Sequence, residues 1–439
     1  MGPVENIAII VVILVFLILL LSGQFISSLL FTTGIIGLYM IGGISLLSGF
    51  LQSEPFNRVA SYSLTTIPLY ILMAQFIMQA GIVKDFYNLV FKISKGKKSL
   101  LGILTVFLGG TLGAVSGSGA ATSAALAQVA VPELKKKGFP ETLAGSIAAA
   151  SGSLSSIIPP SIVLIIYGVT TQTPIGELFV AAFIPGLLMM TVFSIVTVFY
   201  LRSYKGNIES HEDNVEEIDT PVSRYVIVIL AGILIIGSIF GGIYSGIFTP
   251  TESGAVGAII ALVVALLLGK ITKEFIVNSL IETMKVTVMA LIIVIGASIF
   301  GRFVSLSLLP RKIIEMLGTL MESPTLLLTI IMIIYFFLFM FIESLAVILM
   351  TVPILQPILM AANIDLIWFG ILLTIICTLG MMTPPVGMSV YVVGGVSNIP
   401  ITKLFRTSMV FAVVASVVVG GLIITIPELA TWLPQTMKQ

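Results

Sequence analysis

Long apolar stretches separated by short polar connections follow one another along nearly the whole chain. Stretches of about 18 apolar residues or more can cross a hydrocarbon core of about 30 Å as helices. The pattern therefore predicts an all-α polytopic membrane protein. Crossings are expected at about residues 7–22, 25–47, 59–79, 141–171, 177–200, 224–248, 252–269, 277–300, 366–396 and 405–427.

Two other segments fit a different structure. Residues 99–115 and 119–132 are too short to form two comfortable crossings, and the polar sequence SGSG lies between them. A re-entrant hairpin explains this pattern, because non-helical backbone is tolerated at membrane depth only where protein surrounds it. A second hairpin is predicted around MFIESLA, which contains Glu343.

The chain also contains an internal repeat with an offset of about 225 residues. Pro159-Pro160 in IIPPS falls on Pro384-Pro385 in MTPPV, and Pro132 falls on Pro357. Since prolines are sparse inside membrane segments, the matches indicate two related units, each with a hairpin and a proline-broken helix. Further matches at the same offset are Ser155 with Gly380 and Ser118 with Glu343.

Charge predicts how the two units are oriented. Lysines flank both ends of the first hairpin, in KISKGKKS and ELKKKGF, which favours the cytoplasmic side. The second hairpin is flanked by MESPT and AANID, which lack lysine and arginine, so it should enter from the opposite face. We therefore predict an inverted repeat. Arg302, Arg311 and Lys312 would lie outside and fit this topology least well, unless their amphipathic segment follows the outer interface.

The expected organisation follows from these assignments. Each half consists of scaffold helices, a hairpin and a broken helix. The predicted parts are N-terminal scaffold helices (1–58), a first repeat (59–200) with hairpin one (99–132) and a broken helix (141–171), a charged loop with scaffold helices (201–276), a second inverted repeat (277–427) with hairpin two (325–360) and a broken helix (366–396), and a C-terminal tail (428–439).

Composition excludes several classes of protein. The chain is 58% hydrophobic and 9% charged, outside the range of water-soluble domains. A net charge of +1 gives no reason to expect a nucleic-acid partner. The single histidine, His211, lies in the charged loop, and no Ser/His pair, GxGD-type aspartate pair or HExxH motif suggests an enzyme.

The helix breaks carry the candidate chemistry, because inverted repeats with broken helices are typical of secondary transporters. Proline lacks an N–H, so nearby carbonyl oxygens lose their helical donors and can bind a hard cation such as Na⁺. We predict one Na⁺ site at hairpin one and the first break, and a second ion region at the second break. The predicted Na⁺ residues are Ser116, Ser118, Ser155, Ile158, Pro160, Gly380, Thr383 and Pro385.

Substrate contacts are expected beside the same breaks. Glu343 is the one titratable side chain at the predicted sites, and a proton-coupled site would need such a group. The competing interpretation is tight packing of membrane helices, which also favours Gly, Ala and Ser. The predicted substrate residues are Ser116, Ser161, Glu343 and Ser344 and, outside the two breaks, Arg302.

At these residues the chain resembles the large membrane subunit of tripartite ATP-independent periplasmic (TRAP) transporters. The motifs GAVSGSGAATSAA, IIPPSIVLIIYG, TPTESGAVGA and TPPVGMSVYVVGG carry the resemblance, which extends over nearly the whole length. It implies Na⁺-driven uptake of an organic acid, such as a C4-dicarboxylate or sialic acid, by an elevator motion in the bacterial inner membrane. The implied partners are a small four-helix membrane subunit and a periplasmic substrate-binding protein.

Some residues depart from this family pattern or have another explanation. Ser155 replaces the usual glycine, Gln75 stands where many relatives carry an acid, and Arg302 stands where a neutral residue is expected. Arg302 could bind a substrate carboxylate or anchor a helix at the interface, and TPTESG could bind an ion or cap a helix. A binding-protein-independent Na⁺/dicarboxylate transporter with similar hairpins, or a non-transporting scaffold, are the alternative functions.

Overall fold

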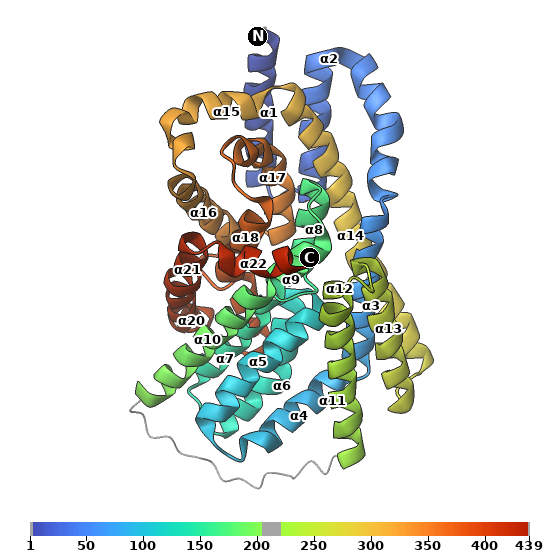
Figure 1. Cartoon of the computed structure of the whole chain (residues 1–439), viewed down its shortest axis with the longest axis vertical. Helices are drawn as coiled ribbons and strands as arrows, with labels where there is room; N and C mark the ends of the chain where they lie inside the picture. Colours follow the sequence, from blue (N-terminus) through green and yellow to red (C-terminus); the bar gives the residue numbers. More distant parts are fainter. Residues whose placement is uncertain (1–2, 204–220, 438–439) are drawn as a thin grey trace.

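The computed structural model describes residues 3–203 and 221–437, and within these ranges every regular element is a helix (Figure 1). The predicted all-α fold is therefore confirmed. Most of the predicted charged loop, including His211, lies outside the described residues.

The first half of the chain runs from the N-terminal helices through hairpin one and the first broken helix. Its α-helices are α1 (Pro3–Leu21), α2 (Ile26–Val59), α3 (Thr66–Gln79), α4 (Ile82–Ser94), α5 (Lys98–Ser116), α6 (Gly119–Lys136), α7 (Glu141–Ser153), α8 (Ile162–Thr171), α9 (Ile175–Ala181) and α10 (Phe183–Ser203).

The second half has the same order of elements and ends in a short helix. Its α-helices are α11 (Val222–Ile236), α12 (Gly242–Tyr244), α13 (Pro250–Leu267), α14 (Lys273–Leu306), α15 (Leu309–Leu317), α16 (Pro324–Phe341), α17 (Ser344–Ala361), α18 (Leu366–Gly380), α19 (Met388–Ser397), α20 (Ile401–Ala415), α21 (Gly421–Thr425) and α22 (Glu428–Thr436).

Eight helices in the described ranges are long and apolar enough to cross a membrane. Two of them, α16 and α17, are the arms of the second hairpin. The arms of the broken helices are shorter, because each break divides one predicted crossing into two pieces.

The repeat predicted from the prolines is visible in the order of the helices. Helices α6 and α17 begin at Gly119 and Ser344, and α7 and α18 begin at Glu141 and Leu366, so both pairs keep the offset of 225. The beginnings of α2, Ile26, and α13, Pro250, are related by an offset of 224, one residue less, which extends the structural repeat into the scaffold helices.

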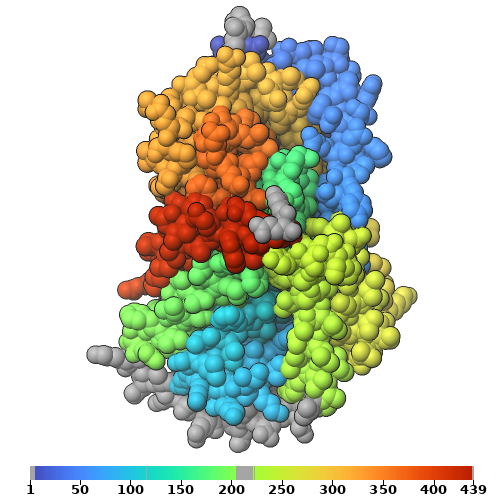
Figure 2. All heavy atoms as spheres, in the orientation of Figure 1, coloured from blue at the N-terminus to red at the C-terminus, as the bar shows by residue number. Residues whose placement is uncertain are grey.

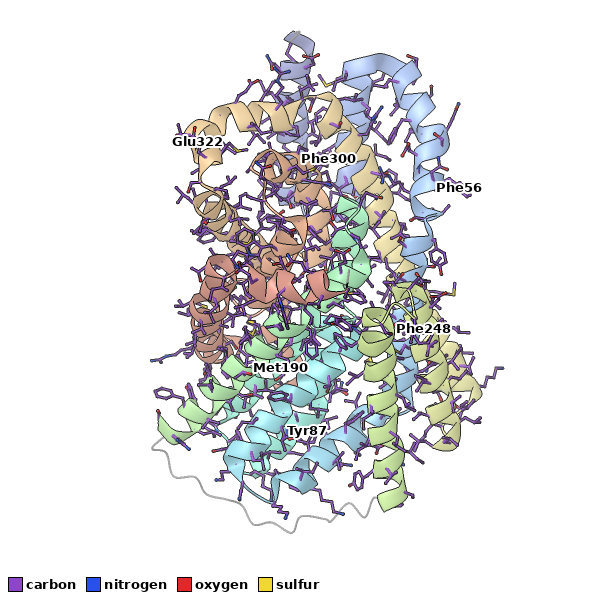
Figure 3. The ribbon with its side chains drawn as sticks, in the orientation of Figure 1. Phe56, Tyr87, Met190, Phe248, Phe300 and Glu322 are labelled. Carbon is purple, nitrogen blue, oxygen red and sulfur yellow. The ribbon has the colours of Figure 1, made fainter. Side chains whose placement is uncertain are left out.

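The two halves lie in opposite orientations. Helix α4 and the first hairpin, α5 and α6, occupy the lower part of Figure 1, whereas α15 and the second hairpin, α16 and α17, occupy the upper part. Tyr87 on α4 and Glu322, which follows α15, lie near opposite ends of the molecule (Figure 3). This arrangement is that of an inverted repeat.

Helix α2 differs from the prediction. The polar sequence around residues 48–58 suggests a connection, but α2 continues through it to Val59. Its one non-helical residue is Gly43, with φ of 67°, a conformation that glycine adopts without a Cβ clash. Glu54 and Arg58, one turn apart, form an ion pair of 3.7 Å along this segment.

Glycines allow the scaffold helices to pack closely. A Cβ on Gly34 of α2 would lie 2.7 Å from the backbone nitrogen of Phe300 on α14, so only glycine permits this approach. At the start of α13, Thr249 and Glu252 form a capping box, with Glu252 Oε2 accepting from Thr249 N at 2.8 Å. The structure therefore supports helix capping as the role of TPTESG.

Candidate functional site

Hairpin one turns at a glycine between two serines. Helix α5 ends at Ser116, Gly117 has φ of 61°, and α6 begins at Gly119. Ser118 caps α6, since its hydroxyl accepts a hydrogen bond from Ala121 N at 3.4 Å. The sequence GSG thus supplies the left-handed residue and the cap that a tight turn within protein requires.

This turn lies against the first break, as predicted. A Cβ on Gly113 would lie 2.9 Å from the backbone nitrogen of Ser155, and one on Gly119 would lie 3.3 Å from the Ser155 hydroxyl oxygen. Side chains at either position would push the hairpin away from the break. The glycines therefore bring Ser116 and Ser118 to the same region as Ser155.

The prolines of the first break leave carbonyl oxygens without helical donors. Pro159 and Pro160 stand four residues after Ser155 and Ser156, at the positions whose N–H groups would close the next helical turns. The Ser161 hydroxyl replaces one of these donors, reaching the Ser156 oxygen at 2.7 Å. Among residues 3–203 and 221–437, nothing donates to the Ser155 carbonyl oxygen.

Ser155 also has an unpaired hydroxyl. Its side chain is fully buried, and its Oγ has no hydrogen-bond partner in the described part of the chain. A buried hydroxyl and a buried carbonyl oxygen without partners are costly unless something else binds them. Ser155 therefore offers two neutral oxygens, which suits a hard cation.

Three further polar residues near hairpin one, Thr122, Ser123 and Ser151, were not among the predicted site residues. Ser116 Oγ is hydrogen-bonded to Thr122 Oγ1 across the turn. Ser123 and Ser151 are buried, and their hydroxyls have no partner among the described residues. The spacing of Ser151 and Ser155, four residues apart on one helical face, is the sequence signal that could have identified Ser151.

Hairpin two turns at Glu343, between the end of α16 and the start of α17. The Glu343 carboxylate caps α17 by accepting from Ala346 N at 3.2 Å. Ser344 accepts a hydrogen bond from the Cys377 thiol of α18 at 3.0 Å. Both predicted residues at this tip therefore already make contacts within the protein.

The second break satisfies its own carbonyl oxygens. The Gly380 oxygen receives hydrogen bonds from Thr383 N, at 3.1 Å, and from Thr383 Oγ1, at 3.0 Å. The Met381 oxygen receives one from Ser389 N at 3.0 Å. These are the two oxygens that Pro384 and Pro385 deprive of helical donors. Within the predicted second ion region, the Gly380 carbonyl oxygen thus already accepts two hydrogen bonds.

The two breaks meet at the centre of the repeat. Ser156 donates from Oγ to the Met381 sulfur at 3.4 Å, and these two positions are equivalent at the offset of 225. A Cβ on Gly119 would also contact the Met381 side chain. Hairpin one therefore touches both breaks, which places the predicted ion residues of the two units in one region.

Arg302 is the predicted site residue that does not join this region. It lies on α14 and borders a cavity of about 570 Å³ whose lining includes no residue of either hairpin tip. The structure therefore does not bring Arg302, a predicted substrate residue, together with Ser116, Ser161, Glu343 and Ser344. The reason is that the part of α14 carrying Arg302 faces the second half of α17, beyond its tip.

Comparisons with known proteins agree with this architecture. A profile described as the tripartite ATP-independent periplasmic transporter, DctM component, matches residues 12–429. The sialic acid TRAP transporter large permease protein SiaM of Vibrio cholerae is 29% identical over 386 residues, covering 88% of this chain and 89% of SiaM.

Two further comparisons extend the result. The C4-dicarboxylate TRAP transporter large permease protein DctM of Pseudomonas aeruginosa is 29% identical over 364 residues, covering 82% of this chain and 83% of DctM. The crystal structure of the Alcanivorax borkumensis YdaH transporter aligns with a TM-score of 0.68 at 13% identity, over 94% of this chain and 97% of YdaH, and shows a shared fold.

Apolar helices, hairpins and a family match over nearly the full length lead to one assignment. The protein is a multi-pass protein of the bacterial inner membrane and a transporter subunit, not an enzyme. The chain belongs to the tripartite ATP-independent periplasmic transporter family, as a DctM component, the large permease.

Proposed function

We propose that this chain couples the inward movement of Na⁺ to the import of a small organic acid. The observation that carries the proposal concerns Ser155, which lies beside the tip of hairpin one. Its buried hydroxyl oxygen and its carbonyl oxygen have no hydrogen-bond partner among the described residues. Neutral oxygens suit Na⁺ better than a proton, which needs a titratable group. Ser116, Ser118, and the carbonyls of Ser155, Ile158 and Pro160 would complete this ion site.

The proposed second ion region is the break between α18 and α19. Pro385 and the Gly380 carbonyl belong to it, but Thr383 is the residue that we expect to contribute an oxygen, since its hydroxyl can rotate away from Gly380. This region would bind its ion more weakly, because the Gly380 oxygen already accepts two hydrogen bonds.

The proposed substrate class is a carboxylate-bearing solute. Related permeases are named for sialic acid, C4-dicarboxylates and 2,3-diketo-L-gulonate, which are all organic acids. Hydroxyl groups of Ser116 and Ser344, near the two hairpin tips, would donate hydrogen bonds to such a solute. Ser161, whose hydroxyl proton is donated to the Ser156 oxygen, would have to give up that bond to do the same. Glu343 caps α17 and would orient this tip.

The proposed mechanism is an elevator motion, in which the unit with both hairpins moves against the scaffold of α2, α3, α13 and α14. A periplasmic substrate-binding protein would deliver the solute, and a small four-helix membrane subunit would brace the scaffold. The close packing of Gly34 on α14 supports a rigid scaffold.

Reconstitution tests this proposal. Proteoliposomes containing the chain and its small subunit should accumulate the solute only with an inward Na⁺ gradient and an added binding protein. Uptake without the binding protein would instead indicate a Na⁺/dicarboxylate transporter with similar hairpins. Normal assembly without any Na⁺-driven uptake, across a panel of organic acids and their binding proteins, would indicate a non-transporting scaffold.

A further inference from the structure

A large cavity lies between the scaffold and the second hairpin. Its volume is about 570 Å³, within the range of about 300–1,000 Å³ typical of sites for small organic molecules. One wall comes from α2 and α14, the other comes from the end of α8 and residues 349–357 of α17, and α15 with the preceding Leu308 completes the lining. Figure 2 shows the end of α8 at the surface between α17 and α2.

The cavity is positively charged. Arg58, Arg302 and Arg311 line it, together with one carboxylate, Glu54. Arg58 is paired with Glu54 at 3.7 Å, and Arg311 with Glu315 at 3.1 Å. Arg302 has no hydrogen bond or ion pair among residues 3–203 and 221–437. One guanidinium is therefore free to bind an anion.

In the opposite wall, the end of α8 is hydrogen-bonded to α17 of the second hairpin. Gln356 of α17 donates its amide N–H to the Thr171 oxygen at the end of α8, at 2.9 Å. This bond makes the end of α8 and the second half of α17 one wall. If the hairpin unit moves against the scaffold, the cavity lies at the boundary that changes, on the face predicted to lie outside.

We propose that this cavity is an outer waiting site for the organic acid, in which Arg302 binds the carboxylate before the solute reaches the hairpin tips. A guanidinium can bind a carboxylate with two parallel hydrogen bonds, which selects for this group over a neutral solute. The inference deepens the proposed function and rests on it for the identity of the solute.

A cysteine placed in the cavity can report its electrostatic potential in an experiment that does not depend on transport. Ser305 lies one turn after Arg302 on α14 and lines the same cavity. The native Cys377 is fully buried, so the unmodified chain serves as the blank for a Ser305→Cys variant. The probes are a negatively charged sulfonatoethyl and a positively charged trimethylammonioethyl methanethiosulfonate.

The charged cavity predicts a clear order of rates. The negative probe should modify Ser305→Cys about five- to twentyfold faster than the positive one, since nearby unit charges change encounter energies by this order. Adding Arg302→Gln should reduce this preference by about threefold or more. Arg406→Gln, which removes an exposed positive charge on α20, should leave the preference unchanged.

Succinate tests carboxylate binding at the same position. It should slow modification of Ser305→Cys by the negative probe, and Arg302→Gln should abolish this protection. Arg302→Lys should keep the rate preference but lose most of the protection, because an ammonium group cannot bind bidentately.

Two results would overturn the waiting site: equal rates for the two probes, or a preference and protection that Arg302→Gln leaves intact. The labelling needs neither Na⁺ nor a binding protein. A failure of uptake in proteoliposomes would therefore leave these rates unchanged, so the two proposals can fail separately.

Discussion

The two helix breaks share one sequence plan and differ in chemistry. Both place two prolines after an apolar helix, and both remove helical donors from two carbonyl oxygens. In the second break, Thr383 and Ser389 supply donors to both oxygens. In the first, Ser161 supplies one donor, and Ser155 keeps two oxygens without partners in the described chain. Repeat symmetry of the backbone therefore does not imply two equal binding sites.

The hairpins differ in a corresponding way. Hairpin one approaches its break through glycines, and Gly152 of α7 lies directly against Ser123. The equivalent position in the second unit is Cys377, whose thiol bonds to Ser344. The first unit thus packs the backbone of α7 against hairpin one, whereas the second has a side chain at the equivalent position that is hydrogen-bonded to its hairpin.

The largest expected effect comes from Gly152→Ala. Its Cβ would lie 2.6 Å from the Ser123 backbone nitrogen, so the hairpin must shift, and we expect a loss of about 1–3 kcal/mol in the free energy of unfolding. Thermal unfolding in detergent measures this. Gly395→Ala is the matched control, since a Cβ there meets nothing within 4 Å. Equal stability of both variants would contradict the close contact.

The double variant Ser116→Ala, Ser118→Ala tests the hairpin tip. We expect the Na⁺ concentration for half-maximal uptake to rise about tenfold or more, because each lost oxygen contact is worth about 1 kcal/mol. Loss of the Ser118 cap should also cost about 1 kcal/mol of stability. Thr272→Ala, which removes the cap of α14, controls for that cost. Lost assembly with unchanged Na⁺ dependence would favour the packing interpretation.

Ser155→Ala compares the breaks directly. Removing the open hydroxyl should raise the half-maximal Na⁺ concentration about five- to tenfold, with the carbonyl oxygen still in place. Ser389→Ala removes the buried, unpaired hydroxyl of the second break and should change this value less than twofold. Stabilisation by Na⁺, measured as the shift in unfolding temperature, provides a second readout. A larger effect of Ser389→Ala would reverse the ranking of the two breaks.

Thr383→Val has the smallest expected effect. Valine keeps the shape of the buried side chain but removes the donor to the Gly380 oxygen, which retains the Thr383 backbone donor. We expect a loss of about 0.5–1 kcal/mol in stability and a small change in Na⁺ dependence. A rise in half-maximal Na⁺ concentration as large as that of Ser155→Ala would show that the two regions bind ions equally well.

Much of the site could be predicted from local sequence. The SGSG turn, the paired prolines and the capping box at Thr249 and Glu252 all act within a few residues, so their structures follow from the chain itself. The helical path through residues 48–58 was missed, because its polar residues resemble those of a loop and only the one-turn Glu54–Arg58 contact favours a helix.

The sequence by itself determined the membrane class, the family, the repeat and the positions of both helix breaks, because apolar length and proline chemistry are local properties. Only the tertiary structure decided which oxygens at the breaks lack a hydrogen-bond partner among the described residues. Whether a donor reaches Ser155 depends on hairpin one, and the separation of Arg302 from the tips depends on how α14 packs against α17. Such contacts join residues far apart in the chain, and no local pattern specifies them.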